Sequence, residues 1–146
     1  MKLKKTRHGD YEKKVTFPVY SEYAVRIVFT DDLPKSRIGR YGNAGAAGEG
    51  DTNAMVSTNS EGCHIFFKPM ARTGVIAHEA YHAVRRMLDW IGANECDEEV
   101  VAYHLTHLVD IIAVFQQRVL AVKSSETGGP NGRCNPQGSM GNMSRL

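Results

Sequence analysis

The sequence predicts one α+β domain, in which a small, mostly antiparallel sheet packs on two helices. Segments rich in β-branched and aromatic residues occupy 15–30 and 54–68, whereas from residue 73 apolar residues recur at intervals of three and four, as in helices. At 146 residues and 42% hydrophobic, the chain can bury a core of its own. We expect a flexible basic N-terminus over 1–14, the folded domain over 15–123, and a flexible tail rich in Gly, Ser, Asn and Pro over 124–146.

The first predicted strands lie within 15–30. Apolar Val25, Ile27 and Phe29 occupy alternate positions around Arg26, which indicates one buried face. Pro18 cannot donate a main-chain hydrogen bond, so the first of these strands should lie at an edge of the sheet or end in a bulge.

Residues 36–53, SRIGRYGNAGAAGEGDTN, are dense in Gly, Asn and Ser. We expect a long mobile loop here, because glycine loses much conformational freedom when it is ordered. A phosphate-binding loop is not indicated, because no Gly-Lys-Ser/Thr sequence follows the glycines and no helical pattern opens on them.

A hairpin is predicted after this loop. AMVST (54–58) and CHIFFK (63–68) are joined by NSEG, which supplies residues that favour turns. Two interpretations of 63–68 remain open. The segment is either a sheet edge to which an extended peptide adds as a further strand, or a core strand with Ile65 and Phe67 buried and no open edge.

Two helices are predicted after the hairpin. In the first, Thr73 is the expected N-cap and Gly92 ends a run of apolar residues that recur at three and four. The second starts near 94–97, where acidic residues suit the positive end of a helix dipole, and runs to about Lys123. Its apolar residues are spaced four and three throughout, which indicates a core or a partner interface: Val101, Leu105, Leu108, Ile112, Phe115, Val119 and Val122.

The stretch HEAYH, residues 78–82, lies in the first of these helices. Residues four apart project from one face of a helix, so His78 and His82 can bind a single ion. Glu79 then sits beside the ion, where it can take a proton from metal-activated water. Zinc suits such a site because three protein ligands leave a fourth position open for chemistry. Two histidines also meet on a helix by chance, but the small alanines around the motif and the preceding strand favour a metal site.

The third ligand has to come from another part of the chain. The metzincin pattern is excluded, because Arg85 and Leu88 occupy the positions of its glycine and its third histidine. Asp89 shares the histidine face, but seven residues of helix carry it about 10 Å along the axis, too far to reach the ion. The start of the next helix offers four acidic candidates, of which one needs to point inward: Glu95, Asp97, Glu98 and Glu99.

With these residues the chain resembles a known family. HEAYH followed by EVVAY (99–103) resembles the HExxH…ExxA arrangement of gluzincin-type metallopeptidases and, more closely, small zinc metallopeptidases encoded by phages and prophages. The resemblance covers about residues 15–115. It implies a minimal zincin-like fold that binds Zn²⁺, with His78, His82 and Glu99 as ligands and Glu79 as the general base.

Helix geometry alone keeps Glu98 as an alternative to Glu99. At about 100° per residue, Glu99, Tyr103 and Asp110 share a polar stripe, while Glu98 lies nearer the apolar one. Such a stripe is usually a solvated face. Tyr103 lies one turn beyond Glu99, and it either packs at the edge of the core or hydrogen-bonds a ligand or a developing oxyanion. Tyr103 therefore joins Glu79 as a candidate catalytic residue.

Composition argues against several other classes. Lys and Arg total 18 against 16 acidic residues, and a net charge of +2 is too small to indicate nucleic acid or a membrane surface as a partner. Three widely spaced cysteines indicate a reducing compartment rather than a disulfide framework. No apolar leader and no run approaching about 20 apolar residues is found. We expect a cytoplasmic protein, in the host cytoplasm or associated with a virion if a phage encodes it.

The predicted function is zinc-dependent hydrolysis of a peptide bond in a peptide or protein substrate. The alternative is a phage virion or assembly protein that uses a zincin-like scaffold as a binding module, without peptidase activity and with phage structural proteins as partners. A shared fold would not decide between these two functions.

Overall fold

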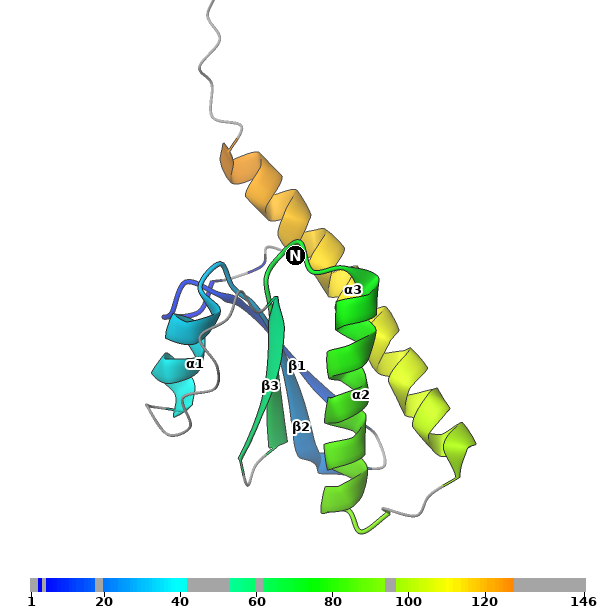
Figure 1. The fold of residues 1–146 in the computed structure, drawn as a ribbon. Helices are drawn as coiled ribbons and strands as arrows, with labels where there is room; N and C mark the ends of the chain where they lie inside the picture. The colour runs from blue at the N-terminus through cyan, green and yellow to red at the C-terminus, as the bar shows by residue number, and fades with distance from the viewer. Residues whose placement is uncertain are drawn as a thin grey trace, which may run out of the picture.

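The computed structural model describes residues 3, 5–17, 20–41, 53–59, 62–93 and 97–127. The elements, in chain order, are β1 (Tyr11–Phe17), β2 (Tyr20–Phe29), α1 (Leu33–Tyr41), β3 (Ala54–Asn59), β4 (Gly62–Phe67), α2 (Thr73–Trp90) and α3 (Glu98–Thr127). The strands form one sheet in the order β1-β2-β4-β3, with α1 on one side and α2 and α3 on the other (Figure 1). The predicted α+β class is confirmed.

Strand pairing in the sheet is mixed. β1 and β2 are antiparallel, as are β3 and β4, whereas the central pair β2 and β4 runs parallel. The alternation predicted for β2 is confirmed, because Val25, Ile27 and Phe29 are at most 1% exposed and belong to the core that the two long helices cover. After β2 the chain continues into α1, and after β4 it continues into α2. The two central strands therefore send their connections to opposite faces of the sheet.

The edges of the described sheet are β1 and β3. A register shift between Thr16 and Phe17 disrupts the end of β1, so an edge strand that ends in a bulge is confirmed, although Pro18 itself lies outside the described residues. The predicted hairpin is also confirmed. Its second strand, β4, lies between β2 and β3 and buries Ile65 and Phe67 completely. The interpretation of 63–68 as an open edge is therefore wrong, because β3 covers that side, and the core-strand interpretation is confirmed.

Helix α2 occupies the predicted segment, but its N-cap is one residue earlier than predicted. Arg72 is the N-cap and makes no side-chain capping bond, so Thr73 is the first helical residue rather than the cap. The end of the helix is as predicted: Gly92 has a φ of 75°, and the N–H of Ala93 donates to the carbonyl of Leu88 at 2.8 Å. This is a Schellman motif, in which glycine adopts the left-handed conformation at low cost.

Helix α3 begins where acidic residues were expected. The Asp97 carboxylate accepts a hydrogen bond from the N–H of Glu99 at 3.1 Å and so caps the first turn. The predicted apolar stripe faces the core, with Leu108, Ile112, Phe115 and Val119 buried and Val101, Leu105 and Val122 packed against them. The core interpretation of the stripe is confirmed.

Helix α1 corrects the predicted loop at 36–53. Residues 36–41 are helical, because contacts distant in sequence hold them on the sheet. Arg40 donates to the Asp10 carboxylate at 2.8 Å and to the Glu12 carboxylate at 3.0 Å, and the Ser36 hydroxyl donates to Asp10 at 2.6 Å. Residues 42–52 lie outside the described residues.

The predicted domain boundaries also shift. β1 already begins at Tyr11, within the segment expected to be flexible, because it pairs with β2 along its whole length. α3 continues to Thr127, four residues beyond the predicted end of the domain. The remainder of the predicted tail, 128–146, lies outside the described residues.

By length and composition alone, α3 is long and apolar enough to cross a membrane. An 18-residue window of the helix has a mean hydropathy of 1.4, and 22% of that window is buried within the fold. The core helix of a soluble protein passes the same test of length and composition. In this structure its most buried residues pack in the core of the α+β domain.

Candidate metal centre

The two histidines of HEAYH lie together on the exposed side of α2. Their Nε2 atoms are hydrogen-bonded to each other at 3.1 Å, one ring donating and the other accepting, and their ring centroids are 4.7 Å apart. With zinc–nitrogen bonds of about 2.05 Å, this separation corresponds to an N–Zn–N angle of about 100°, close to tetrahedral. The helix places His78 and His82 one turn apart, so the predicted convergence of the two imidazoles follows from the spacing.

Glu79 lies beside this pair and is half-buried. Together with His78 it lines a cavity of about 410 Å³ between the first turns of α2 and the start of β3, at Asn53 and Ala54. Its carboxylate therefore shares a hollow with one of the two imidazoles.

The edge strand β3 runs past the same cavity. The N–H of Lys68 donates to the carbonyl of Asn53 at 3.0 Å, so these two residues form a hydrogen-bonded pair of the β3–β4 ladder. Such pairs alternate along an antiparallel ladder, so the N–H and C=O groups of Ala54, Val56 and Thr58 point away from β4. Over the described part of the chain, β3 has no other strand partner.

Glu99 does not join the histidines. It lies in the first turn of α3, next to the far end of α2, because α2 continues for eight residues after His82. Gln116 donates to the carbonyl of Ala71 at the start of α2, and Glu99 precedes Gln116 by 17 residues, which is about 25 Å along the axis of α3. Among the described residues, no His, Cys, Asp or Glu completes a three-ligand group with the pair. Glu99, the third ligand implied by the family resemblance, stays a prediction, as does its alternative Glu98.

The other polar residues on α3 are either exposed to solvent or packed in the core. Tyr103 is 71% exposed, and Glu99 and Asp110 are exposed as well, as expected for a solvated stripe. His104 points the other way and is buried, with its ring 5.3 Å from that of Phe17. Burial lowers the pKa of His104, so the ring is neutral and packs as part of the core.

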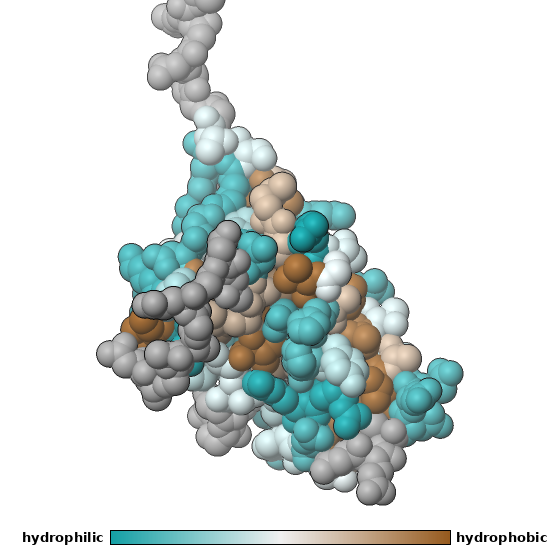
Figure 2. Space-filling view, viewed as in Figure 1, coloured by the Kyte–Doolittle hydropathy of each residue, from teal (hydrophilic) through white to brown (hydrophobic). Residues whose placement is uncertain are grey.

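Sequence reasoning missed the residues at the other end of β3. Arg86, one turn after His82, donates to the hydroxyl of Thr58, and a second cavity of about 410 Å³ opens there beside Trp90. In Figure 2 hydrophilic residues lie over the region of α2 and β3, with hydrophobic residues between them. Arg86 follows His82 by four residues, so the sequence already placed it on the same helix face as the histidines. This spacing could have identified Arg86 as a further site residue.

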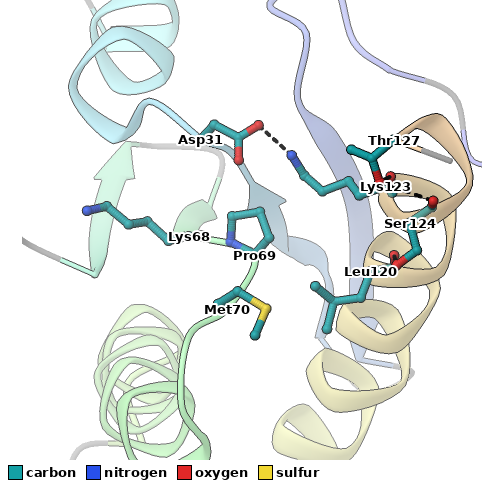
Figure 3. Close-up of a pocket in the computed structure, with 8 residues that line it drawn as sticks. All are labelled: Asp31, Lys68, Pro69, Met70, Leu120, Lys123, Ser124 and Thr127. Atoms are coloured by element: carbon teal, nitrogen blue, oxygen red, sulfur yellow. Dashed lines mark hydrogen bonds and ion pairs between the residues drawn. The ribbon is translucent and has the colours of Figure 1, made fainter. Parts of the chain in front are cut away.

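A third cavity, of about 450 Å³, lies at the carboxyl ends of β2 and β4 (Figure 3). Lys123 and Asp31 form an ion pair at its wall, and Met70 and Leu120 lie below that pair, while the ammonium group of Lys68 points away. The lining offers hydrophobic surface and one ion pair, with no histidine or cysteine. The hydrolytic chemistry therefore fits the HEAYH site better.

On the opposite face of the sheet, a histidine is hydrogen-bonded to a tyrosine. The hydroxyl of Tyr41 is hydrogen-bonded to Nδ1 of His64, and the His64 ring stacks on Phe66. Burial lowers the pKa of His64 to about 4 and raises that of Tyr41 to about 12, so both groups are neutral at pH 7. Cys63, on the core side of β4, is also inert, because burial raises the pKa of its thiol to about 11. Cys96 and Cys134 lie outside the described residues.

Comparisons of the chain with protein-family models, with curated proteins and with solved structures find no match. The functional argument therefore rests on the geometry of the site and on the motifs.

Proposed function

We propose that this protein is a zinc-dependent peptidase that hydrolyses peptide bonds of an extended polypeptide lying along β3. The observation that carries the proposal is the 3.1 Å separation of the His78 and His82 Nε2 atoms beside the cavity that Glu79 lines. Two nitrogen donors at this separation suit one zinc ion. The two donors fit, but the described residues supply no third ligand.

Each site residue has a separate task in this proposal. His78 and His82 hold the ion, which when bound supplies a Lewis acid that polarises a carbonyl group and acidifies water. Glu79 accepts the proton of the attacking water and returns it to the leaving amine. The outward N–H and C=O groups of β3 hold the substrate backbone and fix its register, without reading much of its sequence.

Zinc content and one isosteric substitution test the proposal. The purified protein should contain about one zinc per chain and should cleave unfolded proteins or peptides. Glu79→Gln should abolish cleavage and keep the zinc, because it removes the base but leaves both imidazoles. Glu22→Gln is the matched control, since Glu22 is an exposed glutamate on β2. Cleavage that survives Glu79→Gln, or a protein that binds no zinc, would overturn the proposal.

One observation favours a second function, a binding or assembly module without peptidase activity. The described residues bring two donors together and not three, and two donors suffice for an ion shared with a partner. The affinity of such a module for its partner would not change on Glu79→Gln. The module would also leave peptides intact with zinc present, which separates it from the peptidase.

A further inference from the structure

The cavity beside Trp90 is built from three elements. Tyr23 comes from β2, Thr58 from β3, and Arg86, Asp89 and Trp90 from the last turns of α2. Trp90 is 46% exposed, and its ring centroid lies 5.4 Å from that of Tyr23, at an interplanar angle of 47°. The cavity therefore has an aromatic wall that is fixed on one side and open to a ligand on the other.

This cavity and the histidine pair lie along the same edge. The start of β3 faces the turn of α2 that carries His78, and the end of β3, at Thr58, faces the turn that carries Arg86. Eight residues of helix from His78 to Arg86 span about 12 Å, and four residues of strand from Ala54 to Thr58 span about 13 Å. An extended chain paired with β3 therefore passes both sites, about three or four residues apart.

The charges around the cavity define the side chain that fits. Asp89 and Arg86 carry opposite charges at its rim, and the guanidinium of Arg86 is anchored by Thr58 at 3.4 Å. The two opposite charges offset each other, so the rim has no net charge that would favour a cationic or an anionic side chain. A neutral ring can stack on Trp90, and a hydroxyl on that ring can donate to the carboxylate while it accepts from the guanidinium.

We propose that this cavity is a subsite for an aromatic side chain, preferably tyrosine, of a polypeptide bound along β3. With the polypeptide antiparallel to β3, the aromatic residue lies about three or four positions on the N-terminal side of the residue at the histidine pair. The role of this residue in directing cleavage rests on the proposed function. Binding of a polypeptide along β3 is part of the same proposal, but it can be measured without zinc and without cleavage, because neither His78 nor Glu79 lines the cavity.

The single tryptophan of the chain reports directly on this cavity. Extended Thr- and Val-rich peptides, without tryptophan and with one central Tyr, Phe, Leu, Lys or Glu, are titrated into the Glu79→Gln protein without zinc. Trp90 emission should shift to shorter wavelength and saturate, because a bound ring excludes water. The Tyr peptide should bind tightest, about 2- to 10-fold tighter than the Phe peptide, as expected for one net hydrogen bond of its hydroxyl.

Substitutions in the cavity complete the test. Asp89→Asn and Arg86→Gln should each reduce the preference for Tyr over Phe, whereas Asp110→Asn, at an exposed position on α3, should not. Trp90→Leu, followed by the anisotropy of a labelled Tyr peptide, should lose most of the affinity. Absence of a saturable emission change, or Lys or Glu peptides that bind as tightly as the Tyr peptide, would overturn the subsite. If the Tyr peptide binds but no peptide is cut with zinc present, the subsite stands and the peptidase fails.

Discussion

His78 and His82 present their Nε2 atoms 3.1 Å apart on an exposed helix face, a separation at which, in the proposed function, both nitrogens can bind one ion. A site organised in this way loses little conformational entropy when the ion binds. It also depends on both donors, because one imidazole alone holds zinc weakly. The two histidines should therefore behave as one unit.

We expect His82→Ala to abolish the zinc-dependent increase in thermal stability. In the wild type, zinc at a concentration one hundred times its dissociation constant should stabilise the fold by about 2.7 kcal/mol. Differential scanning fluorimetry with and without zinc measures this difference. His107→Ala is the control, because His107 is also an exposed histidine on a helix. Equal zinc stabilisation of the His82→Ala and wild-type proteins would contradict the assignment.

We expect Glu99→Gln to leave zinc affinity unchanged, as measured by calorimetric titration. In the structure Glu99 lies at the far end of α2 from the histidines, and its main-chain N–H is held by Asp97. A tenfold or greater loss of affinity would instead establish Glu99 as the third ligand implied by the family resemblance. Glu98→Gln is the matched variant, since it tests the neighbouring candidate in the same turn.

The sequence was sufficient to predict the elements whose residues are neighbours along the chain. In α2 the apolar residues recur at three and four, and Gly92 marks its end, so local pattern and structure agree. The paired imidazoles were predictable for the same reason, because helix geometry alone places residues 78 and 82 on one face. The hairpin of β3 and β4 likewise depends on a short turn between them.

Contacts between distant segments were not predictable. Helix α1 is held by the ion pairs of Arg40 with Asp10 and Glu12, and nothing in the local sequence indicates these partners. The parallel pairing of β4 with β2 joins segments that are distant in the chain, so the sequence did not show which strand would lie beside β4. The third ligand, Glu99 or Glu98, stays a prediction for a related reason. A motif spacing does not specify where α3 begins relative to α2.

Gly62→Ala should destabilise the fold by at least about 2 kcal/mol, measured by urea unfolding. Gly62 has a φ of 143°, and a Cβ atom there would lie 2.0 Å from the carbonyl oxygen of Ala24 on β2. The parallel pairing of β2 and β4 would have to open at that point. Gly74→Ala is the control, because Gly74 lies in α2 with open space around it, and alanine should stabilise a helix there by up to about 1 kcal/mol. Similar unfolding midpoints for the two variants would refute this account.

Acidification should destabilise the protein through His64. Burial lowers the pKa of this histidine to about 4 in the folded state, from about 6.5 in an unfolded chain. Between these two values the unfolded state binds more protons than the folded state, so stability falls as the pH decreases from about 6.5 to about 4. His64→Gln should flatten this part of the curve of unfolding free energy against pH, measured by urea titration. The burial-shifted His104 stays in both proteins, so only the contribution of His64 changes. Parallel curves for variant and wild type would show that His64 does not titrate in this way.

The parallel alignment of β2 with β4 also has a consequence for how the chain reaches its native state. Ala24 pairs with Gly62, 38 positions later, whereas β1 with β2 and β3 with β4 join segments adjacent in the chain. Closing the longer loop costs more chain entropy before any contact compensates for it. The two hairpins can therefore form first, and β2 and β4 pair last. We therefore expect the rate-limiting barrier to folding at the junction of the two hairpins, where the missing side chain of Gly62 lets β4 approach Ala24 on β2.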